Sequence, residues 1–408
     1  MNKYNKIYFI GYFYNKIEGK ILMEKAFNYM VDYLKKSSTK KNIIKISIFA
    51  LLIRSTLLIF ESGDYTMFLS KWCEYLKSNG GFKAIVSIEA DYNVVYLYFL
   101  AFFTYLPIKY LYSIKILSII FDFVMALGAY LITYEFYKDD ENVKVYQTLS
   151  FAAVLFMPTV ILNSSFWAQC DSIYADFVVF SLYFMLKKKY NTSFILYAVA
   201  ITFKLQAIFL LPVYGLLYLK NKEFSIFKFL WIPIVNFLLY IPAIILGKPI
   251  SSVFDAYFTQ VNNYDYKIVF GYPNIYNFFP LDAVYLIKPG IIFTMCLLAV
   301  VALIVLYTRK KINNEDIIEL SIGIIFLVTY FLPKMHERYA FVAEVLVVIY
   351  FIISKKNQNA TMIAMLVALA TYGAGLMGLP DFVVTTIALF QIYPVVIFIK
   401  NIISKRES

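Results

Sequence analysis

Charged residues are scarce in this chain of 408 residues: Asp, Glu, Lys and Arg make up 16% of it, whereas 61% is hydrophobic. Soluble domains carry about a quarter charged and about half apolar residues. The mean hydropathy of +0.69 expresses the same imbalance. The composition therefore excludes a soluble globular protein and indicates an all-α protein integral to a membrane.

Residues that build disulfides and metal centres are also few. The chain has three cysteines, Cys73, Cys170 and Cys296, and a single histidine. The unrelated spacings of the cysteines give neither a disulfide framework nor a metal pattern, so we interpret them as packing residues. Because no compact carboxylate cluster compels a divalent ion, we expect no cofactor and no metal.

The formal net charge of +12 does not indicate nucleic-acid binding, because Lys and Arg form short clusters between apolar runs rather than one basic face. The positive-inside rule places these clusters in the cytoplasm. They lie at residues 35–41, around 138, and at 187–189, 220–222, 309–311, 355–356 and 400–406.

The apolar runs between the basic clusters predict a bundle of about 12 transmembrane helices, since about 20 residues cross the hydrocarbon core. Counted from a cytoplasmic N-terminus, these crossings leave every basic cluster inside. The runs are residues 43–60, 113–136, 146–163, 166–186, 193–205, 206–219, 225–246, 290–307, 316–332, 339–354, 359–377 and 382–399.

Two parts of this pattern are not simple crossings. The run 94–111 breaks the parity, and its tyrosines with Pro107 and Lys109 suit the headgroup zone, so we predict an interfacial or re-entrant element there. The runs 193–205 and 206–219 are short, which predicts a hairpin whose tip, near Lys204, stops in the outer leaflet.

The chain then divides into four segments. Residues 1–42 lack a cleavable signal and are expected to form a cytoplasmic amphipathic segment. Residues 43–246 form a transmembrane module that includes a large external loop, 61–113. Residues 247–289 form a second external loop, and residues 290–408 form a C-terminal transmembrane module.

Polar residues collect at the predicted external face, where ionisable groups near helix ends are functional candidates. Asp64 directly follows a predicted crossing and could accept a proton from an attacking hydroxyl, although Gly63–Asp64 is also common turn chemistry. Lys204 stands alone among apolar residues and needs an anion. A lipid phosphate suits that depth, and snorkelling to the headgroups is the alternative.

Two further external turns carry candidates. In the turn 334–338, Arg338 could hold a phosphate bidentately and His336 could donate to it; the alternative is an interfacial anchor with a Glu337–Arg338 pair. In the turn 163–174, Asp171 could hydrogen-bond sugar hydroxyls and Trp167 could stack on a sugar ring. The alternative there is helix capping with a membrane-belt tryptophan.

Taken in order, these motifs resemble the GT-C superfamily, multi-spanning glycosyltransferases that take sugars from polyprenyl- or dolichyl-phosphate carriers. The likeness covers residues 63–344 and is greatest to bacterial polyprenyl-phosphate-dependent mannosyl- or glucosyltransferases and to dolichyl-phosphate-glucose glucosyltransferases. The motifs are Gly63-Asp64-Tyr65 with Trp72, Asp91-Tyr92, Trp167-Ala168-Gln169-Cys170-Asp171, Lys204-Leu205-Gln206, Tyr257 to Gln260, Asn274 to Asn277, and His336-Glu337-Arg338-Tyr339.

The resemblance implies an inverting hexose transfer from a polyprenyl-phosphate sugar to a glycan, glycolipid or protein acceptor. It places the active site on the external face of a bacterial cytoplasmic membrane, beside a first loop of membrane-parallel helices. It implies that Asp64 is the general base and that Lys204, Arg338 and His336 bind the donor phosphate in place of a metal. The residues that it implies for sugar or acceptor binding are Asp91, Tyr92, Trp167, Gln169, Asp171, Gln206, Gln260 and Asn277.

Two other functions remain open. A transporter or flippase of a lipid-linked or anionic solute would use the same cations without a general base, although the internal repeats common in transporters are not evident. A glycan polymerase or ligase that uses a diphosphate-linked oligosaccharide would also place Arg and His in external loops.

Overall fold

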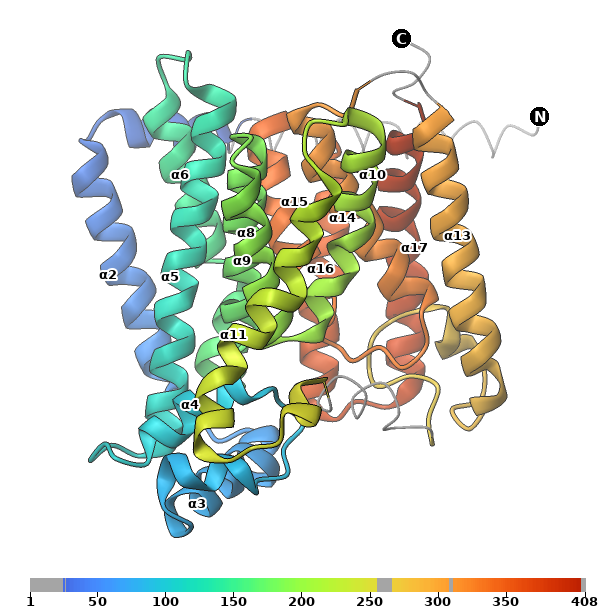
Figure 1. The fold of residues 1–408 in the computed structure, drawn as a ribbon. Coiled ribbons are helices and arrows are strands. Elements are labelled where there is room, and N and C mark those ends of the chain that lie inside the picture. Colours follow the sequence, from blue (N-terminus) through green and yellow to red (C-terminus); the bar gives the residue numbers. More distant parts are fainter. Residues whose placement is uncertain (1–24, 26, 255–265, 308–310, 405–408) are drawn as a thin grey trace.

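The computed structural model describes residues 25, 27–254, 266–307 and 311–404. In this part of the chain the backbone forms helices and loops, and no strand is present apart from isolated bridges between His336 and residues 270–271. Most of the long helices run side by side as a bundle, and the short helices of the first loop gather at one end of it (Figure 1). The all-helical class predicted from composition is confirmed.

The long helices each overlap a predicted apolar run, although several begin or end five or more residues away from the bounds of the run. They are α2 (Thr39–Leu57), α5 (Tyr110–Tyr137), α6 (Val143–Leu155), α8 (Asp171–Leu186), α9 (Tyr190–Phe203), α10 (Leu211–Asn221), α11 (Trp231–Leu246), α13 (Ile287–Tyr307), α14 (Asn314–Phe331), α15 (Phe341–Ser354), α16 (Gln358–Met377) and α17 (Asp381–Ser404). Shorter helices join them: η1 (Tyr65–Leu69), α3 (Ser70–Ser78), η2 (Gly81–Val86), α4 (Val94–Phe103), α7 (Pro158–Ile161), η3 (Leu162–Phe166), η4 (Leu205–Leu210), η5 (Ile226–Leu230), η6 (Ile250–Phe254), η7 (Ile275–Phe278) and η8 (Val284–Leu286).

Membrane crossing is supported for fewer helices than the sequence predicts. Among the described residues, five helices are long and apolar enough to cross, and a sixth is added if Val143–Leu155 and Pro158–Phe166, which meet at 50°, form one broken span. Helices α9, α10 and α15 have 14, 11 and 14 residues. At about 1.5 Å per residue they fall short of about 30 Å of hydrocarbon. The protein is therefore a membrane protein whose predicted twelve crossings are supported only in part.

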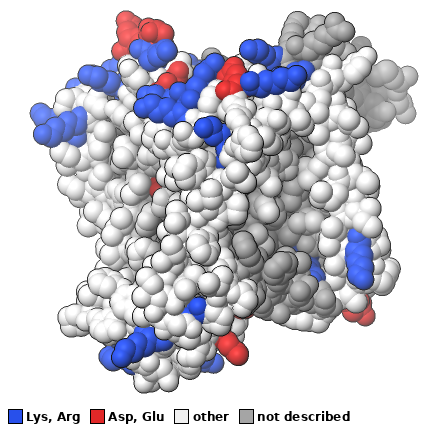
Figure 2. All heavy atoms as spheres, in the orientation of Figure 1, with Lys and Arg blue, Asp and Glu red and all other residues white. Residues whose placement is uncertain are grey.

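Charge is distributed as a bilayer requires. On the visible face, Lys and Arg gather at one end of the bundle, a few lie at the other end, and the broad belt between them carries almost no charge (Figure 2). Helices α8, α10 and α15, which end at or just before three of the basic clusters, all end at the same end of the bundle (Figure 1). The loop helices α3 and α4 lie at the opposite end, as expected if one end is cytoplasmic.

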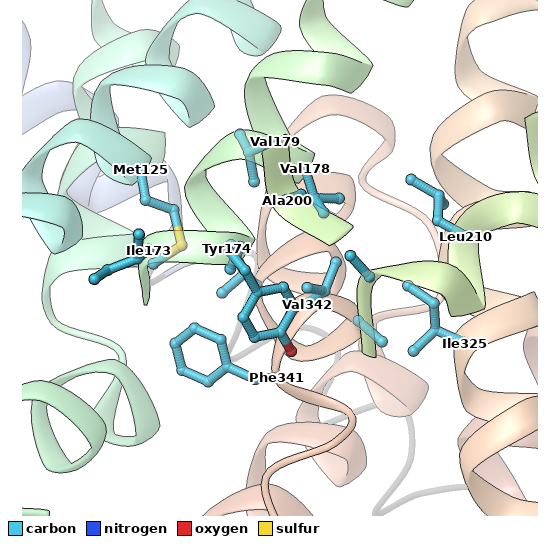
Figure 3. Close-up of a cluster of buried hydrophobic side chains, with 14 of the residues drawn as sticks. Met125, Ile173, Tyr174, Val178, Val179, Ala200, Leu210, Ile325, Phe341 and Val342 are labelled. Carbon is cyan, nitrogen blue, oxygen red and sulfur yellow. The ribbon is translucent and has the colours of Figure 1, made fainter. Parts of the chain in front are cut away.

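Apolar packing joins the two halves of the chain. Side chains from α5, α8, α9, η4, α14 and α15 converge in the cluster drawn in Figure 3. Ile173, Val178 and Phe341 in this cluster are fully buried. A Cβ atom on Gly128 would lie 2.7 Å from Val179, so α5 and α8 approach closely at a residue without a side chain.

A buried ion pair ties α2 to the rest of the bundle. Arg54 Nε lies 2.9 Å from Asp122 Oδ2, and both side chains are at most 1% exposed. Ser164 donates to Asp122 over 2.6 Å, Ser172 also donates to it, and Arg54 Nη2 donates to the Leu155 carbonyl over 3.0 Å. A charge inside a membrane is tolerated only with such partners, so α2, α5, η3 and α8 must meet here.

The two unusual parts of the sequence pattern fold as follows. Residues 94–103 form the ten-residue α4, too short to cross, beside the loop helices (Figure 1). Helix α9 ends at Phe203, and the extended backbone of Lys204 leads into η4 and α10, which gives the predicted interruption at Lys204.

The topology predicts opposite labelling at two exposed positions. In a Cys296→Ala background, which removes the exposed native thiol, a membrane-impermeant thiol reagent should label Asn79→Cys in sealed cells. It should label Lys188→Cys only after the membrane is opened, because α3, which Asn79 follows, and the C-terminal end of α8, near Lys188, lie at opposite ends of the bundle. Labelling of Lys188→Cys in sealed cells would overturn the orientation.

Candidate active site

Asp64 stands at the start of η1, on a segment that a buried lysine holds in place. The last carbonyls of a helix lack partners within it. The Nζ atom of Lys115, on α5, donates to the carbonyls of Leu57, Leu58 and Phe60 over 3.0, 3.2 and 2.6 Å. The α2 C-terminus and the residues leading to Asp64 are thereby fixed to α5.

A second tether joins this segment to the turn between η3 and α8. The Ser62 hydroxyl donates to the Trp167 carbonyl over 2.6 Å and accepts from the Tyr65 amide over 3.2 Å. In the turn, Ala168 has a φ of 62°, a left-handed conformation that costs energy for a residue with a side chain. The Gln169 carbonyl accepts from Ser118 over 2.7 Å, which anchors the turn to α5.

The turn aims Gln169 at Asp64. Gln169 Nε2 donates to Asp64 Oδ2 over 2.6 Å, and its Oε1 accepts from the Tyr92 hydroxyl over 3.2 Å. The Asp64 side chain remains 31% exposed. One carboxylate oxygen is therefore held while the group stays accessible to a ligand.

Arg338 is the centre of the charged cluster. Its Nη1 lies 2.9 Å from Asp64 Oδ2 and 3.1 Å from Glu337 Oε1, and its Nε lies 3.5 Å from Asp171 Oδ2. The guanidinium carbon lies over the Trp167 ring, 4.7 Å from its centroid, a cation–π contact. Burial alone would lower the pKa of Arg338, but the three carboxylates raise it above its ordinary value, so the side chain stays charged.

Lys204 pairs with Asp171 across the same cluster. Its Nζ donates to Asp171 Oδ1, while Asp171 Oδ2 also accepts from Asn163 over 2.8 Å. The ammonium lies 5.5 Å from the centre of the Tyr92 ring. The anion that Lys204 requires is thus supplied within the chain by a residue distant in sequence, and Asp171 lies between Lys204 and Arg338.

His336 and Glu337 lie next to each other in the turn that precedes α15. The ring of His336 stacks on Phe270, with centroids 4.9 Å apart. Burial, together with Arg338 and Lys204, lowers the pKa of His336 to about 3, so its imidazole is neutral at physiological pH. Burial raises the pKa of Glu337 and Arg338 opposes this rise. A Cβ on Gly375 would lie 3.3 Å from Glu337 and 3.0 Å from Trp167, so this glycine makes room for both side chains.

These groups surround a cavity of about 180 Å³ at the end of the bundle that holds α3 and α4. The buried Oε1 of Gln206 has no hydrogen-bond partner among the described residues and could accept from a ligand. The predicted site residues that line the cavity are Asp64, Asp91, Tyr92, Gln169, Lys204, Gln206, His336 and Arg338.

The other predicted residues lie elsewhere. Asp171 and Trp167 are 2% and 5% exposed and stand behind the cavity, where they hold Lys204 and Arg338. Asn277 lines a neighbouring cavity of about 250 Å³, which shares His336 with the first, and its Oδ1 accepts from the Asn274 amide over 2.7 Å. Gln260 lies outside the described residues.

Sequence reasoning missed the supporting polar groups. Lys115 and Asp122 fall inside the apolar run 113–136, and Arg54 falls inside 43–60. A charged residue within an apolar run was the available signal. It could not identify the partner, because the partners are carbonyls or side chains on other helices. Glu337 was interpreted only as an alternative partner of Arg338.

Comparison with known proteins adds no assignment. No protein-family model matches the chain, and no curated protein matches it significantly. Among the described residues, no group of three or more His, Cys, Asp or Glu side chains is arranged to hold a metal ion.

The role of Lys115 can be tested by its loss. We expect Lys115→Met to destabilise the protein by about 1 to 3 kcal/mol, because the carbonyls of Leu57, Leu58 and Phe60 lose a buried donor. Lys109→Met, at the exposed start of α5, is the matched control and should change stability little. Thermal unfolding in lipid nanodiscs measures both variants, and equal stabilities would contradict the proposed tether.

Proposed function

We propose that the chain is a membrane glycosyltransferase that moves a hexose from a polyprenyl-phosphate sugar to an acceptor on the non-cytoplasmic face, with inversion at the sugar carbon. The observation that carries this proposal is the meeting of Asp64, Lys204 and Arg338 around one cavity at the end of the bundle opposite the basic clusters. A proton acceptor and two cations are what this transfer requires.

The reaction assigns one role to each group. The acceptor oxygen attacks the anomeric carbon, its proton passes to Asp64, and the bond between the sugar carbon and the phosphate oxygen breaks with its electron pair left on the phosphate. Asp64 acts as general base. Lys204 and Arg338 stabilise the charge that develops on the departing lipid phosphate, and they do so best where water is excluded.

The remaining residues orient and recognise the substrates. Gln169 fixes the orientation of Asp64, and Tyr92 fixes Gln169. The neutral imidazole of His336 is suited to donate a hydrogen bond without adding charge. Asp91 and Gln206, which also line the cavity, carry acceptors suited to sugar hydroxyls.

Asp64→Asn separates a base from a binding group. Asn keeps the shape but cannot take the proton, and general-base catalysis is worth about 10² to 10⁴-fold. We expect this variant to retain donor binding and to transfer sugar at least about a hundredfold more slowly. Release of free polyprenyl phosphate from a panel of polyprenyl-phosphate sugars measures turnover, and Glu74→Gln, an exposed acid on α3, is the control. Near-normal transfer by Asp64→Asn would remove Asp64 from the base role.

Loss of either cation should weaken donor use. Truncation of one partner in a buried charge pair costs about 2 to 5 kcal/mol, so we expect Lys204→Ala and Arg338→Ala to lose a corresponding part of kcat/KM for the donor. Arg338→Lys keeps the positive charge and is a control for misfolding. Its kcat/KM for the donor should fall less than that of Arg338→Ala. Lys83→Ala, an exposed lysine of the first loop, is the control. Normal donor kinetics in both alanine variants would exclude a phosphate site here.

A further inference from the structure

The charged groups around Arg338 do not favour an incoming phosphate. Asp64, Glu337 and Asp171 face Arg338, and Lys204, the one other cation of the cluster among the described residues, is paired with Asp171. This cluster therefore contains more carboxylates than cations among the described residues. A lipid phosphate that binds here must compete with a carboxylate for Arg338.

The proposed reaction changes this competition at one moment. A sugar linked to a lipid through phosphate is a phosphodiester with one negative charge, whereas the released lipid monophosphate gains a second ionisable oxygen. In the same step Asp64 takes up the acceptor proton and becomes neutral. The need for a cation thus moves from Asp64 to the departing phosphate, while the total charge of site and substrates stays constant.

We propose that Arg338 is shared between the general base and the leaving group: it pairs with Asp64 before transfer and with the lipid phosphate once Asp64 is protonated. This inference rests on the proposed glycosyl transfer and adds a coupling between its two charge changes. Proton uptake by Asp64 then releases the cation that the leaving phosphate needs, and deprotonation of Asp64 afterwards helps to expel the lipid product.

The geometry assigns the shared role to Arg338 rather than to Lys204. Nη1 of Arg338 contacts Asp64 and Glu337, while its buried Nε faces Asp171 Oδ2 at 3.5 Å, so Nη1 is the atom at which a phosphate can replace Asp64. The contact with the Trp167 ring holds the guanidinium in place while its partners exchange. Lys204 is paired with Asp171 in this cluster, so neutralisation of Asp64 leaves its pairing unchanged.

The experiment measures equilibrium binding of undecaprenyl phosphate, the probe for the lipid product, to the full chain in nanodiscs. A pH of about 8 keeps the phosphate monoester doubly charged. Asp64→Asn imitates the protonated base, and we expect it to bind the probe about tenfold more tightly than wild type, since one charge-assisted hydrogen bond is redirected to the phosphate. The gain should persist in a Lys204→Gln background and vanish in an Arg338→Gln background.

Asp91→Asn is the matched control. Asp91 lines the same cavity, so its neutralisation reports the general effect of removing a negative charge near the phosphate, and we expect a gain of less than about twofold. An Asp64→Asn gain no larger than that of Asp91→Asn would overturn the shared role. A gain that survives in Arg338→Gln would overturn it as well. Absence of binding in wild type and in every variant would remove the phosphate site itself, and with it the proposed function.

Discussion

The Arg338 guanidinium is buried at the end of the bundle that holds α3 and α4, and the rest of the site depends on this burial. A charge removed from water needs close partners of opposite sign. Those partners come from separate parts of the chain: Asp64 from the loop after α2, Asp171 from the start of α8, and Glu337 from the turn before α15. The cluster therefore fixes how these three segments meet.

The second buried ion pair serves this convergence from within the bundle. Arg54 and Asp122 lock α2 to α5, and the serines that complete the pair lie in η3 and α8, on either side of the Trp167 turn. Lys115 then fixes the α2 end from which the Asp64 segment leaves. Support of this kind holds the Asp64 carboxylate in place while its side chain stays partly exposed.

The sequence predicts the positions of the helices better than it predicts which helices cross the membrane. It also predicts which charged residues need a partner better than it predicts the partner. An apolar run determines where a helix lies, whereas crossing the membrane depends on how long the helix remains once the turns have formed. Helices α9 and α10 are shortened by the turn at Lys204. Lys204 could be recognised as a cation that needs an anion. Its partner Asp171 is on another helix, and nothing in local spacing pairs them. The flat ring of Trp167 predicts a surface on which a sugar ring stacks, but in the fold the Arg338 guanidinium lies over that ring.

The excess of carboxylates over cations also bears on the choice between chemistry and transport. A site that only captures an anion gains affinity from unpaired cations and loses it to each nearby carboxylate. Around Arg338 the acids outnumber the bases, and one of them, Asp64, stays partly exposed while Gln169 holds its orientation. Such an arrangement disfavours plain anion binding. It suits the proposed reaction, in which one carboxylate is neutralised by a proton as new negative charge appears beside it, because the cation is then released where it is needed.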